Sequence, residues 1–362
     1  MKIAITADVH LVPGGEHPER LNALRNIFEQ VEAEGIGVLI IAGDLFDKDV
    51  QDFGDFEALC QEHQKVQVEV IPGNHDPALS SGMIAAENVT VHDTVEVAKI
   101  GDTLFLFVPY SEGKNMGEQI AGKKSDLDNE AGRWVLVSHG DFIGGVKERD
   151  PYEPGIYMPL YRKDLDTFRP RAAFLGHIHL VADVPENVHG KAVYPGSPCG
   201  LDISETGRRR FLVYDTTEGS LESRTVDTSV LFFRESFLVI PGDDEVSRLE
   251  AAIAGRIRGW ELEPGENEKV QLRVEARGYA CDRQGIADAF STGFSGFSFD
   301  GETGADLDKV QLAARDDNRA KIASETLELI ENELDWDFSA EDEPSREDVK
   351  EQVLRSIYQV GS

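Results

Sequence analysis

Short apolar segments, each ending at a polar loop, run through the chain up to about residue 230. We expect buried strands at residues 2–6, 38–42, 66–71, 104–108, 134–137 and 172–175. Between the first two lies a helical pattern, with apolar side chains at Leu21, Leu24, Ile27, Phe28 and Val31. This alternation of strand and helix predicts an α/β sheet. The strands expected at 192–194, 210–214 and 221–226 have a more antiparallel pattern.

A second unit is expected to start near Arg234. Its first strand, at 237–240, ends at a Pro-Gly pair, and Asp243 or Asp244 could cap the helix that follows. With a further strand at 270–274, this pattern predicts a small α+β domain. The stretch 291–304 is rich in glycine and serine, which is typical of a linker or an irregular edge.

Two amphipathic helices are predicted in the last part of the chain, on either side of an acidic segment at 335–344. The first carries Ala323, Leu327, Ile330 and Leu334 on one face, and the second carries Val349, Val353, Leu354, Ile357 and Tyr358. Helices of this size bury little surface alone. We therefore expect them either to pack on the body of the chain or to dock a partner.

The composition restricts the partners and the surroundings of the protein. The 362 residues include 36 lysines and arginines against 68 aspartates and glutamates, a net charge of −32. Such acidity by itself disfavours nucleic acid, because the phosphate backbone repels it. The sequence contains no run of about 18 apolar residues, so it predicts no membrane-spanning helix. Its three widely spaced cysteines argue against a disulfide framework and favour a cytoplasmic protein.

Five motifs of metal-ligating residues each follow one of the predicted strands. In chain order they are Asp8-Val9-His10, Gly43-Asp44, Gly73-Asn74-His75-Asp76, Ser138-His139-Gly140 and Gly176-His177-Ile178-His179. Functional groups collect at the carboxyl ends of strands in an open α/β sheet. Carboxylate, imidazole and amide groups are also the ligands of divalent transition metals. Each motif alone is compatible with an ordinary turn, but the ordered set indicates a metal site.

The order of these motifs resembles the calcineurin-like metallophosphoesterase superfamily over roughly the first two hundred residues. The resemblance implies a four-layer α/β/β/α sandwich that holds two divalent metal ions. It implies that Asp8, His10 and His179 bind one ion, that Asn74, His139 and His177 bind the other, and that Asp44 bridges both. It also favours Mn²⁺, whereas the ligand types alone fit Fe²⁺ or Zn²⁺ as well.

His75 and Asp47 are the predicted catalytic residues. We expect His75, next to the ligand Asn74, to donate a proton to the leaving oxygen or to stabilise the charged transition state. Asp47 could hydrogen-bond to that imidazole and orient it; the alternative is a carboxylate at the start of a helix. The attacking group would be a hydroxide activated by the two metal ions.

Further features resemble the SbcD-type DNA double-strand-break repair nucleases of this superfamily. They are the segment Tyr194-Pro195-Gly196-Ser197-Pro198 and the contexts Ala-Gly-Asp-Leu-Phe-Asp and Pro-Gly-Asn-His-Asp. Lys48 stands where phosphoprotein phosphatases carry an arginine, which disfavours that class. The resemblance implies a metallophosphoesterase nuclease domain over 1–233, a DNA-positioning capping domain over 234–304 and a helical docking segment over 305–362.

The same resemblance implies a Mn²⁺-dependent DNA exonuclease and endonuclease that acts in DNA repair and recombination as a homodimer. Its C-terminal helices would bind an SbcC-like ABC-type ATPase through Leu327, Ile330, Leu334, Val353 and Ile357. Candidate DNA contacts are Lys123-Lys124, Lys147 with Arg149, Arg162-Lys163, Arg169 with Arg171 and, densest of all, Arg208-Arg209-Arg210. Two alternatives are a phosphodiesterase or phosphatase that acts on a small phosphate ester, and a non-catalytic scaffold.

Overall fold

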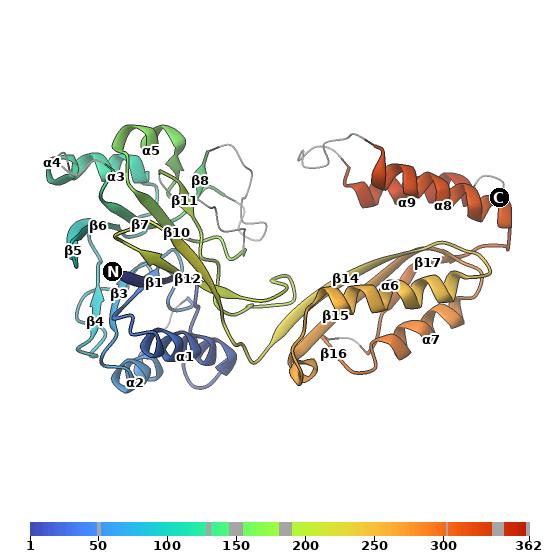
Figure 1. Cartoon of the computed structure of the whole chain (residues 1–362), viewed down its shortest axis with the longest axis horizontal. Coiled ribbons are helices and arrows are strands. Elements are labelled where there is room, and N and C mark those ends of the chain that lie inside the picture. Colours follow the sequence, from blue (N-terminus) through green and yellow to red (C-terminus); the bar gives the residue numbers. More distant parts are fainter. Residues whose placement is uncertain are drawn as a thin grey trace. The chain divides into compact units, whose positions relative to one another are not determined.

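The computed structural model describes residues 1–48, 52–127, 132–144, 155–180, 190–301, 303–334 and 344–359. The chain divides into two compact units (Figure 1). The first comprises Met1–Leu201 with Arg208–Val230, and the second comprises Asp202–Gly207 with Leu231–Ser362. None of the helices in the described ranges is long and apolar enough to cross a membrane.

Two mixed β-sheets form the centre of the first unit. One has the strand order β13-β12-β1-β2-β3-β4, the other has the order β11-β10-β7-β6-β5, and β8 and β9 form a separate pair. The strands are β1 (Lys2–Thr6), β2 (Val38–Ala42), β3 (Gln67–Ile71), β4 (Val89–Val91), β5 (Glu96–Ile100), β6 (Thr103–Val108), β7 (Val135–His139), β8 (Phe142–Ile143), β9 (Leu160–Tyr161), β10 (Ala172–Gly176), β11 (Ala192–Val193), β12 (Arg210–Asp215) and β13 (Leu221–Thr225). The expected antiparallel pairing of β12 and β13 is present, whereas β11, which was expected to share this pattern, pairs in parallel with β10.

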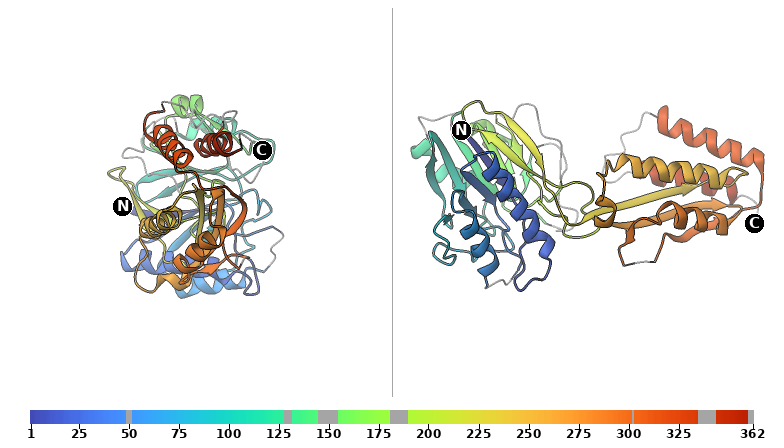
Figure 2. Two further views of the ribbon diagram at one scale, coloured as in Figure 1. Left: turned by 90° about the vertical axis from the view of Figure 1, so that its right-hand side faces the viewer. Right: turned by 60° about the horizontal axis from the view of Figure 1, so that its bottom comes forward.

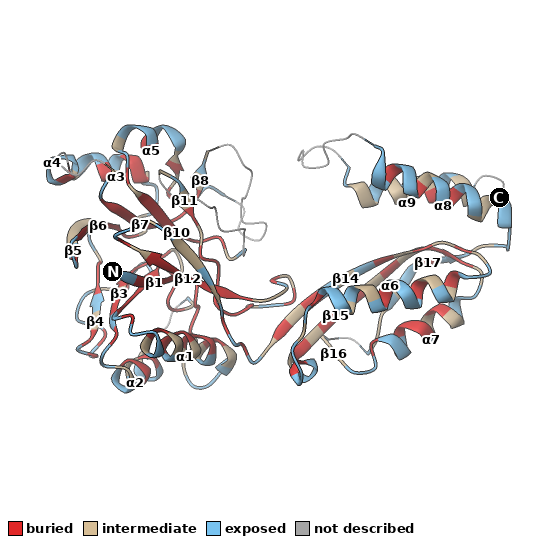
Figure 3. Ribbon diagram, viewed as in Figure 1, coloured by how far each residue is buried: buried red, intermediate tan, exposed pale blue. Residues whose placement is uncertain are grey.

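Helices cover the outer face of each sheet, which makes four layers (Figure 2). They are α1 (Pro18–Ala33), α2 (Gly54–Glu62), α3 (Met116–Gly122), α4 (Lys124–Leu127) and α5 (Arg162–Phe168). Ile3 and Ile5 of β1 meet Phe105 and Phe107 of β6 between the sheets. Residues of opposite parity, such as Ala4, face the helices instead. Burial on both faces explains the continuous apolar strands, which Figure 3 shows as buried.

The second unit is a parallel α/β layer structure, not the expected α+β domain. Its elements are β14 (Leu231–Val239), α6 (Glu245–Gly259), the 3₁₀ helix η1 (Glu266–Lys269), β15 (Val270–Ala280), α7 (Arg283–Gly293), β16 (Ser298–Phe299), β17 (Asp306–Leu312), α8 (Asp317–Asn332) and α9 (Arg346–Tyr358). The central strand β15 pairs in parallel with β14, β16 and β17. Helices α6 and α7 cross over between successive strands, which parallel pairing requires.

Helices α8 and α9 pack on the chain's own sheet, opposite α6 and α7 (Figure 2). Tyr279 of β15 forms an apolar cluster with Leu327, Ile330 and Leu354. On this side the sheet is apolar at the carboxyl ends of β14 and β15, where Leu238, Ile240 and Tyr279 are covered by the two helices. Residues 306–312 belong to the same sheet, so the expected boundary between residues 304 and 305 does not separate two units.

The packing of α8 and α9 also changes the set of candidate ATPase contacts. Leu327 and Ile330 are buried, and Val353 and Ile357 pack against the same cluster. Leu327 and Ile330 therefore serve the fold of this chain, whereas Val353 and Ile357 are half-buried and also line a groove beside the two helices. Of the five expected contacts, Leu334 is the exposed one, at 38% of its surface.

Candidate metal centre

The five strand-end motifs meet in the first unit because their loops are hydrogen-bonded to one another. The Asp8 N–H donates to the Gly43 carbonyl at 3.1 Å, and the His10 N–H donates to the Asp44 carbonyl at 3.0 Å. The loops after β1 and β2 therefore lie side by side. On the other sheet, the Gly140 N–H donates to the Gly176 carbonyl at 3.2 Å, which joins the loops after β7 and β10.

Two glycines let these loops approach closely. Gly43 has a positive φ of 94°, and a Cβ there would overlap the His139 ring. A Cβ on Gly176 would overlap both the Ala42 carbonyl oxygen and the same ring. The glycines that precede Asp44 and His177 are thus needed to place His139 between the two sheets.

Asp44 lies at the centre of the cluster. One carboxylate oxygen, Oδ1, accepts the His75 N–H at 2.8 Å. The other, Oδ2, lies 3.3 Å from His139 Nε2 and 3.7 Å from His10 Nε2. Asp44 Oδ2 thus lies between His139 and His10, one from each predicted ligand set, which is a position suited to a bridging carboxylate.

On one side of Asp44, the side chains of Asp8, His10 and His179 converge. His10 Nε2 and His179 Nε2 lie 3.1 Å apart, with two ring nitrogens directed at the same point. Asp8 Oδ1 accepts the His177 N–H at 2.8 Å, whereas the buried Asp8 Oδ2 has no hydrogen-bond partner. A buried oxygen without a donor is costly. This donor set fits a divalent cation, which both nitrogens and the oxygen could ligate.

On the other side of Asp44 lie Asn74, His139 and His177. Asn74 Oδ1 lies 2.7 Å from His139 Nε2 and 3.1 Å from His177 Nδ1. The Nδ1 of His139 is 3.0 Å from the Ala42 carbonyl, so this nitrogen donates and Nε2 is left to bind a metal. The structure therefore brings all seven sequence-predicted ligand positions together, and their types fit two divalent ions.

Burial gives the centre unusual electrostatics. Removal from water raises the pKa of Asp8 to about 6 and lowers the pKa of His10 and of His177 to about 3. For Asp44, burial acts in the same direction as for Asp8, but the nearby His139 outweighs it and lowers the pKa. Two buried carboxylates among imidazoles form a dry site that favours a bound cation, which would displace any proton on the ligands.

His75 and Asp47 lie beside this ligand set. His75 Nδ1 is 3.3 Å from Asp47 Oδ1, and the His75 ring meets the His10 ring edge-on at 4.6 Å. The hydrogen bond to His75 holds the pKa of Asp47 well below its usual range. Asp47 itself is not helical, and the next helix in the described residues, α2, starts at Gly54. The geometry thus places the carboxylate where it can orient the imidazole.

Sequence reasoning missed several supporting residues. Arg20 is buried and donates to the His10 carbonyl at 2.8 Å, with the Asp47 carboxylate 3.4 Å away. The spacing of Arg20 from Leu24 and Ile27 places it on the buried face of the helix, and this pattern could have indicated its role from the sequence. Asp76 accepts N–H bonds from Gly73 and Phe46 and so joins the loops after β2 and β3. Both residues act by fixing the loops that carry the ligands.

Two further residues surround His177. Asp141 Oδ1 lies 3.8 Å from His177 Nε2, and Asp141 Oδ2 accepts the Tyr157 N–H. The Tyr157 ring lies against the His177 ring, with centroids 4.7 Å apart. No sequence spacing connects these positions, because they come together only through the fold. They restrict the orientation of the His177 ring.

The Arg208-Arg209-Arg210 cluster is not the surface patch that we expected. Arg209 and Arg210 are buried, at 2% and 8% exposure. Arg209 donates to the Ser197 carbonyl at 3.0 Å and also to the Ser197 hydroxyl and the His179 carbonyl. Arg209 is therefore a support for a ligand loop. Among the other basic candidates, Lys147 and Arg149 lie outside the described residues.

The segment 194–198 has a similar supporting role. The Tyr194 hydroxyl donates to the Gly140 carbonyl at 2.9 Å and accepts the Phe142 N–H at 2.7 Å. Ser197 is fully buried against Arg209. The segment that resembles SbcD-type nucleases thus holds the loops of His139 and His179 in place.

Comparisons with known proteins agree with this geometry. The family profile described as calcineurin-like phosphoesterase matches residues 1–181, a range that contains all seven ligand positions. The chain is 24% identical over 217 residues to the uncharacterized metallophosphoesterase YhaO of Bacillus subtilis (strain 168). That match covers 55% of this chain and 50% of YhaO, so the chain spans about half the length of this curated relative.

Two solved structures are similar to the chain. One is a novel archaeal phosphodiesterase, with 18% identity, a TM-score of 0.33 and coverage of 62% of this chain and 100% of that protein. The other is a protein from Thermus thermophilus, with 16% identity, a TM-score of 0.42 and coverage of 62% of this chain and 98% of that protein.

Proposed function

Because the chain belongs to the calcineurin-like phosphoesterase family, we propose that it hydrolyses phosphodiester bonds in DNA as a metal-dependent nuclease. One observation carries the hydrolytic part of this proposal. Six ligand-type side chains converge around Asp44, with the His75 and Asp47 pair beside them. That arrangement combines a cation site with a candidate proton donor.

Each group has a defined role in the proposed reaction. Asp8, His10 and His179 hold one ion, Asn74, His139 and His177 hold the other, and Asp44 is shared. When bound, two divalent ions, which we propose to be Mn²⁺, supply a Lewis acid for the phosphoryl oxygens and activate water. His75 donates its proton to the leaving oxygen, and Asp47 holds the imidazole for that transfer. Arg20 in turn fixes Asp47.

The choice of DNA rests on the resemblance to SbcD-type nucleases and on the second unit. The resemblance lies in residues that shape the metal centre, such as Tyr194 and Ser197. A parallel α/β unit of more than a hundred residues follows the catalytic unit and is available to position a large substrate. The ions offset the acidity of the chain locally. A small phosphate ester is the alternative substrate.

The decisive experiment is a nuclease assay on end-labelled linear duplex and hairpin DNA with Mn²⁺. We expect degradation that a chelator stops and that His75→Ala abolishes, while the variant still binds Mn²⁺. Hydrolysis of bis-p-nitrophenyl phosphate without any cleavage of DNA would contradict the nuclease and leave the small-ester alternative. Near wild-type kcat in His75→Ala would remove His75 from the mechanism.

We also propose that the nuclease is a homodimer and that α8 and α9 bind the coiled coil of an ABC-type ATPase. Packing on the sheet leaves the outer side of these helices for a partner. A groove of about 530 Å³ lies there, lined in part by Ile322, Thr326 and Val349. Ile322 and Leu329 are more than half exposed. Ile322→Asp is expected to end co-purification with the co-expressed ATPase, whereas unchanged co-purification would contradict this docking.

A further inference from the structure

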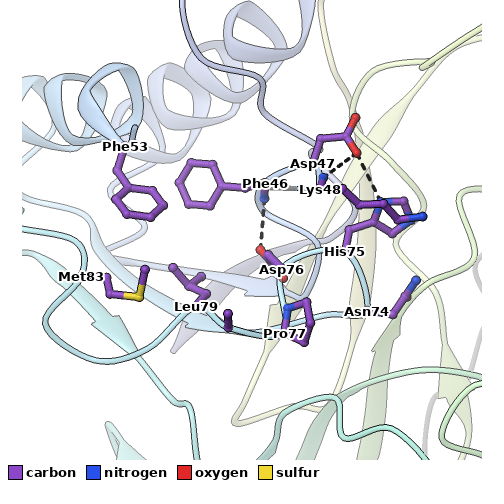
Figure 4. Close-up of a pocket in the computed structure, with 11 residues that line it drawn as sticks. Phe46, Asp47, Lys48, Phe53, Asn74, His75, Asp76, Pro77, Leu79 and Met83 are labelled. Carbon is purple, nitrogen blue, oxygen red and sulfur yellow. Dashed lines mark hydrogen bonds and ion pairs between the residues drawn. The ribbon is translucent and has the colours of Figure 1, made fainter. Parts of the chain in front are cut away.

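A cavity of about 450 Å³ opens beside the metal centre, and its lining divides into two ends (Figure 4). The polar end consists of residues of the candidate site and their neighbour: Asp47, Lys48, Asn74 and His75. The apolar end consists of Phe46, Phe53, Leu79 and Met83. One continuous cavity thus connects the proposed proton donor with an apolar surface that the hydrolytic chemistry does not use.

The apolar end has a firm floor and an open rim. Phe46 and Leu79 are buried, at 3% and 4% exposure, whereas Phe53 is half-buried and Met83 is 41% exposed. The Phe46 and Phe53 rings support each other at a centroid distance of 4.9 Å. Figure 4 shows both rings on one side and Leu79 with Met83 on the other. Aromatic and thioether side chains in this arrangement suit a flat aromatic ring.

Among the described residues that line the apolar end, the polar side chain is that of Asp76, and it is already in use. Both carboxylate oxygens of Asp76 accept backbone N–H groups, from Gly73 at 2.7 Å and from Phe46 at 3.1 Å. The four apolar side chains offer neither a strong donor nor a strong acceptor. As far as the described lining residues go, a ring bound between them would therefore be held by stacking and burial, without recognition of its edge.

At the polar end, Lys48 supplies a positive charge. Its side chain is exposed and lines the same cavity as His75 (Figure 4). An ammonium group at this position can contact a phosphate that adjoins the ring. The cavity thus presents, in order, a cation site, a proton donor with a lysine, and an apolar slot.

We propose that this cavity is a nucleobase subsite, which takes the base next to the scissile phosphate on the side of the leaving oxygen. This inference rests on the proposed function and names its substrate class more closely: nucleotides, bound without preference among bases. A cavity of this volume accepts one small ring-bearing group. Stacking tolerates any base, because every base has an aromatic face.

Binding measurements test the subsite without relying on turnover. Calorimetry with Mn²⁺ would compare deoxyadenosine 5′-monophosphate with deoxyribose 5-phosphate, which lacks the base. We expect the nucleotide to bind wild-type protein about tenfold more tightly or better, the effect of one stacked base. Phe53→Ala is expected to remove most of that ratio and to leave the affinity for deoxyribose 5-phosphate unchanged. Phe53→Leu, which keeps the packing on Phe46, should remove part of it.

The matched control is Leu312→Ala, which shortens an apolar side chain that is 71% exposed in the second unit. It should keep the wild-type ratio. An equal affinity of wild-type protein for both probes, or an unchanged ratio in Phe53→Ala, would overturn the subsite while the metal centre stands. If neither probe binds in the presence of Mn²⁺, the metal centre and the subsite both fall.

Discussion

Both units bury acidic side chains where parallel strands end, but the carboxylate oxygens differ in their hydrogen bonds. In the first unit, Asp8 Oδ2 is buried without a hydrogen-bond partner. In the second, the buried Glu245 carboxylate accepts N–H groups from Gly242, Cys281 and Asp282, at 3.3, 2.8 and 2.6 Å. A buried oxygen without a hydrogen-bond donor lowers the stability of the fold, whereas a buried carboxylate that accepts hydrogen bonds raises it. The first arrangement is useful only if a ligand completes it.

Backbone conformation differs in the same way. Four non-glycine residues of the metal centre, Asp8, His10, Asp44 and His177, have positive φ angles of 55°, 51°, 49° and 98°. Among the described residues of the second unit, Glu261 alone outside glycine does. Positive φ is unfavourable for such residues and persists where the surroundings impose it, which is common at functional sites. The comparison therefore locates the chemistry in the first unit and predicts which substitutions separate activity from stability.

The largest expected effect is that of Asp8→Asn, which should lower activity while it raises stability. Loss of this carboxylate should reduce Mn²⁺-dependent phosphodiester hydrolysis by about a thousandfold, because a ligand of one ion is weakened. The metal-free variant should nevertheless be more stable than wild type at pH 7, by about 1 to 2 kcal/mol. Hydrolysis of bis-p-nitrophenyl phosphate and urea unfolding in a chelator measure the two effects.

The pH dependence of that stability difference supplies the control. Burial raises the pKa of Asp8 to about 6, above its ordinary value of 3.8. The ionised carboxylate therefore destabilises the metal-free fold above pH 6, and this cost disappears as pH falls from 6 towards 4. The advantage of Asp8→Asn should shrink over the same interval. An advantage that persists at pH 4 would show that ionisation is not its cause.

Glu245→Ala should have the opposite outcome. It leaves three backbone N–H groups without their acceptor, and we expect a loss of about 3 kcal/mol in the free energy of unfolding of the second unit. Hydrogen exchange in peptides from α6 and β15 should rise, while exchange in β1 and β2 stays unchanged. Hydrolysis of bis-p-nitrophenyl phosphate should stay within about twofold of wild type. A large loss of hydrolysis would break the proposed division between the units.

A smaller effect is expected for Arg20→Met, which tests whether a positioning residue of the metal centre behaves like a ligand. Without the guanidinium, Asp47 and the His10 carbonyl lose a shared partner. We expect kcat to fall by about 10- to 100-fold with KM and bound Mn²⁺ unchanged, the usual effect of a residue behind the ligands. Arg20→Lys should recover part of kcat. If Arg20→Met lost bound Mn²⁺ as well as kcat, Arg20 would instead maintain the ligand geometry of His10.

The sequence predicted the buried strands well and the exposed ones poorly. Observed β1 and β2 have the expected bounds, because both faces are apolar. Strands β4, β5 and β17 were missed, and β17 has one buried residue, Val310. Strands with a solvated face carry no apolar run to detect. The Gly/Ser-rich stretch hid the short β16, and the expected cap Asp244 makes no side-chain capping bond at α6.

In the candidate site, too, the residues that local sequence patterns mark were predicted, and those that depend on long-range contacts were not. The five motifs were visible because each combines a ligand-type residue with a strand end, and the structure places their side chains together. Asp141 and Tyr157 were not visible, because their contacts with His177 depend on packing between distant segments. Arg209 and Arg210 were misassigned to the surface, because charge alone does not reveal that a fold encloses an arginine with its acceptors.

The smallest predicted effect concerns His92, which shows that the first unit also contains a satisfied buried charge. His92 Nε2 lies 2.8 Å from Glu69, Nδ1 faces Glu96, and the ring stacks on Phe107. Only the protonated imidazole donates from both nitrogens. Burial alone would lower the pKa of His92, but the hydrogen bonds to Glu69 and Glu96 outweigh it and raise the pKa. This network resembles Glu245 more than it resembles the metal centre.

His92→Gln should therefore lower the free energy of unfolding by about 1 kcal/mol. The rate of hydrolysis should stay unchanged. Because the folded pKa lies above the ordinary value of 6.5, the stabilisation by His92 is complete below pH 6.5 and is lost as pH rises through the folded pKa. Urea unfolding of both proteins from pH 5.5 to 9 measures this trend. A difference that grows with pH would mean that His92 is buried as a neutral ring, and the network would then belong with the costly groups of the metal centre.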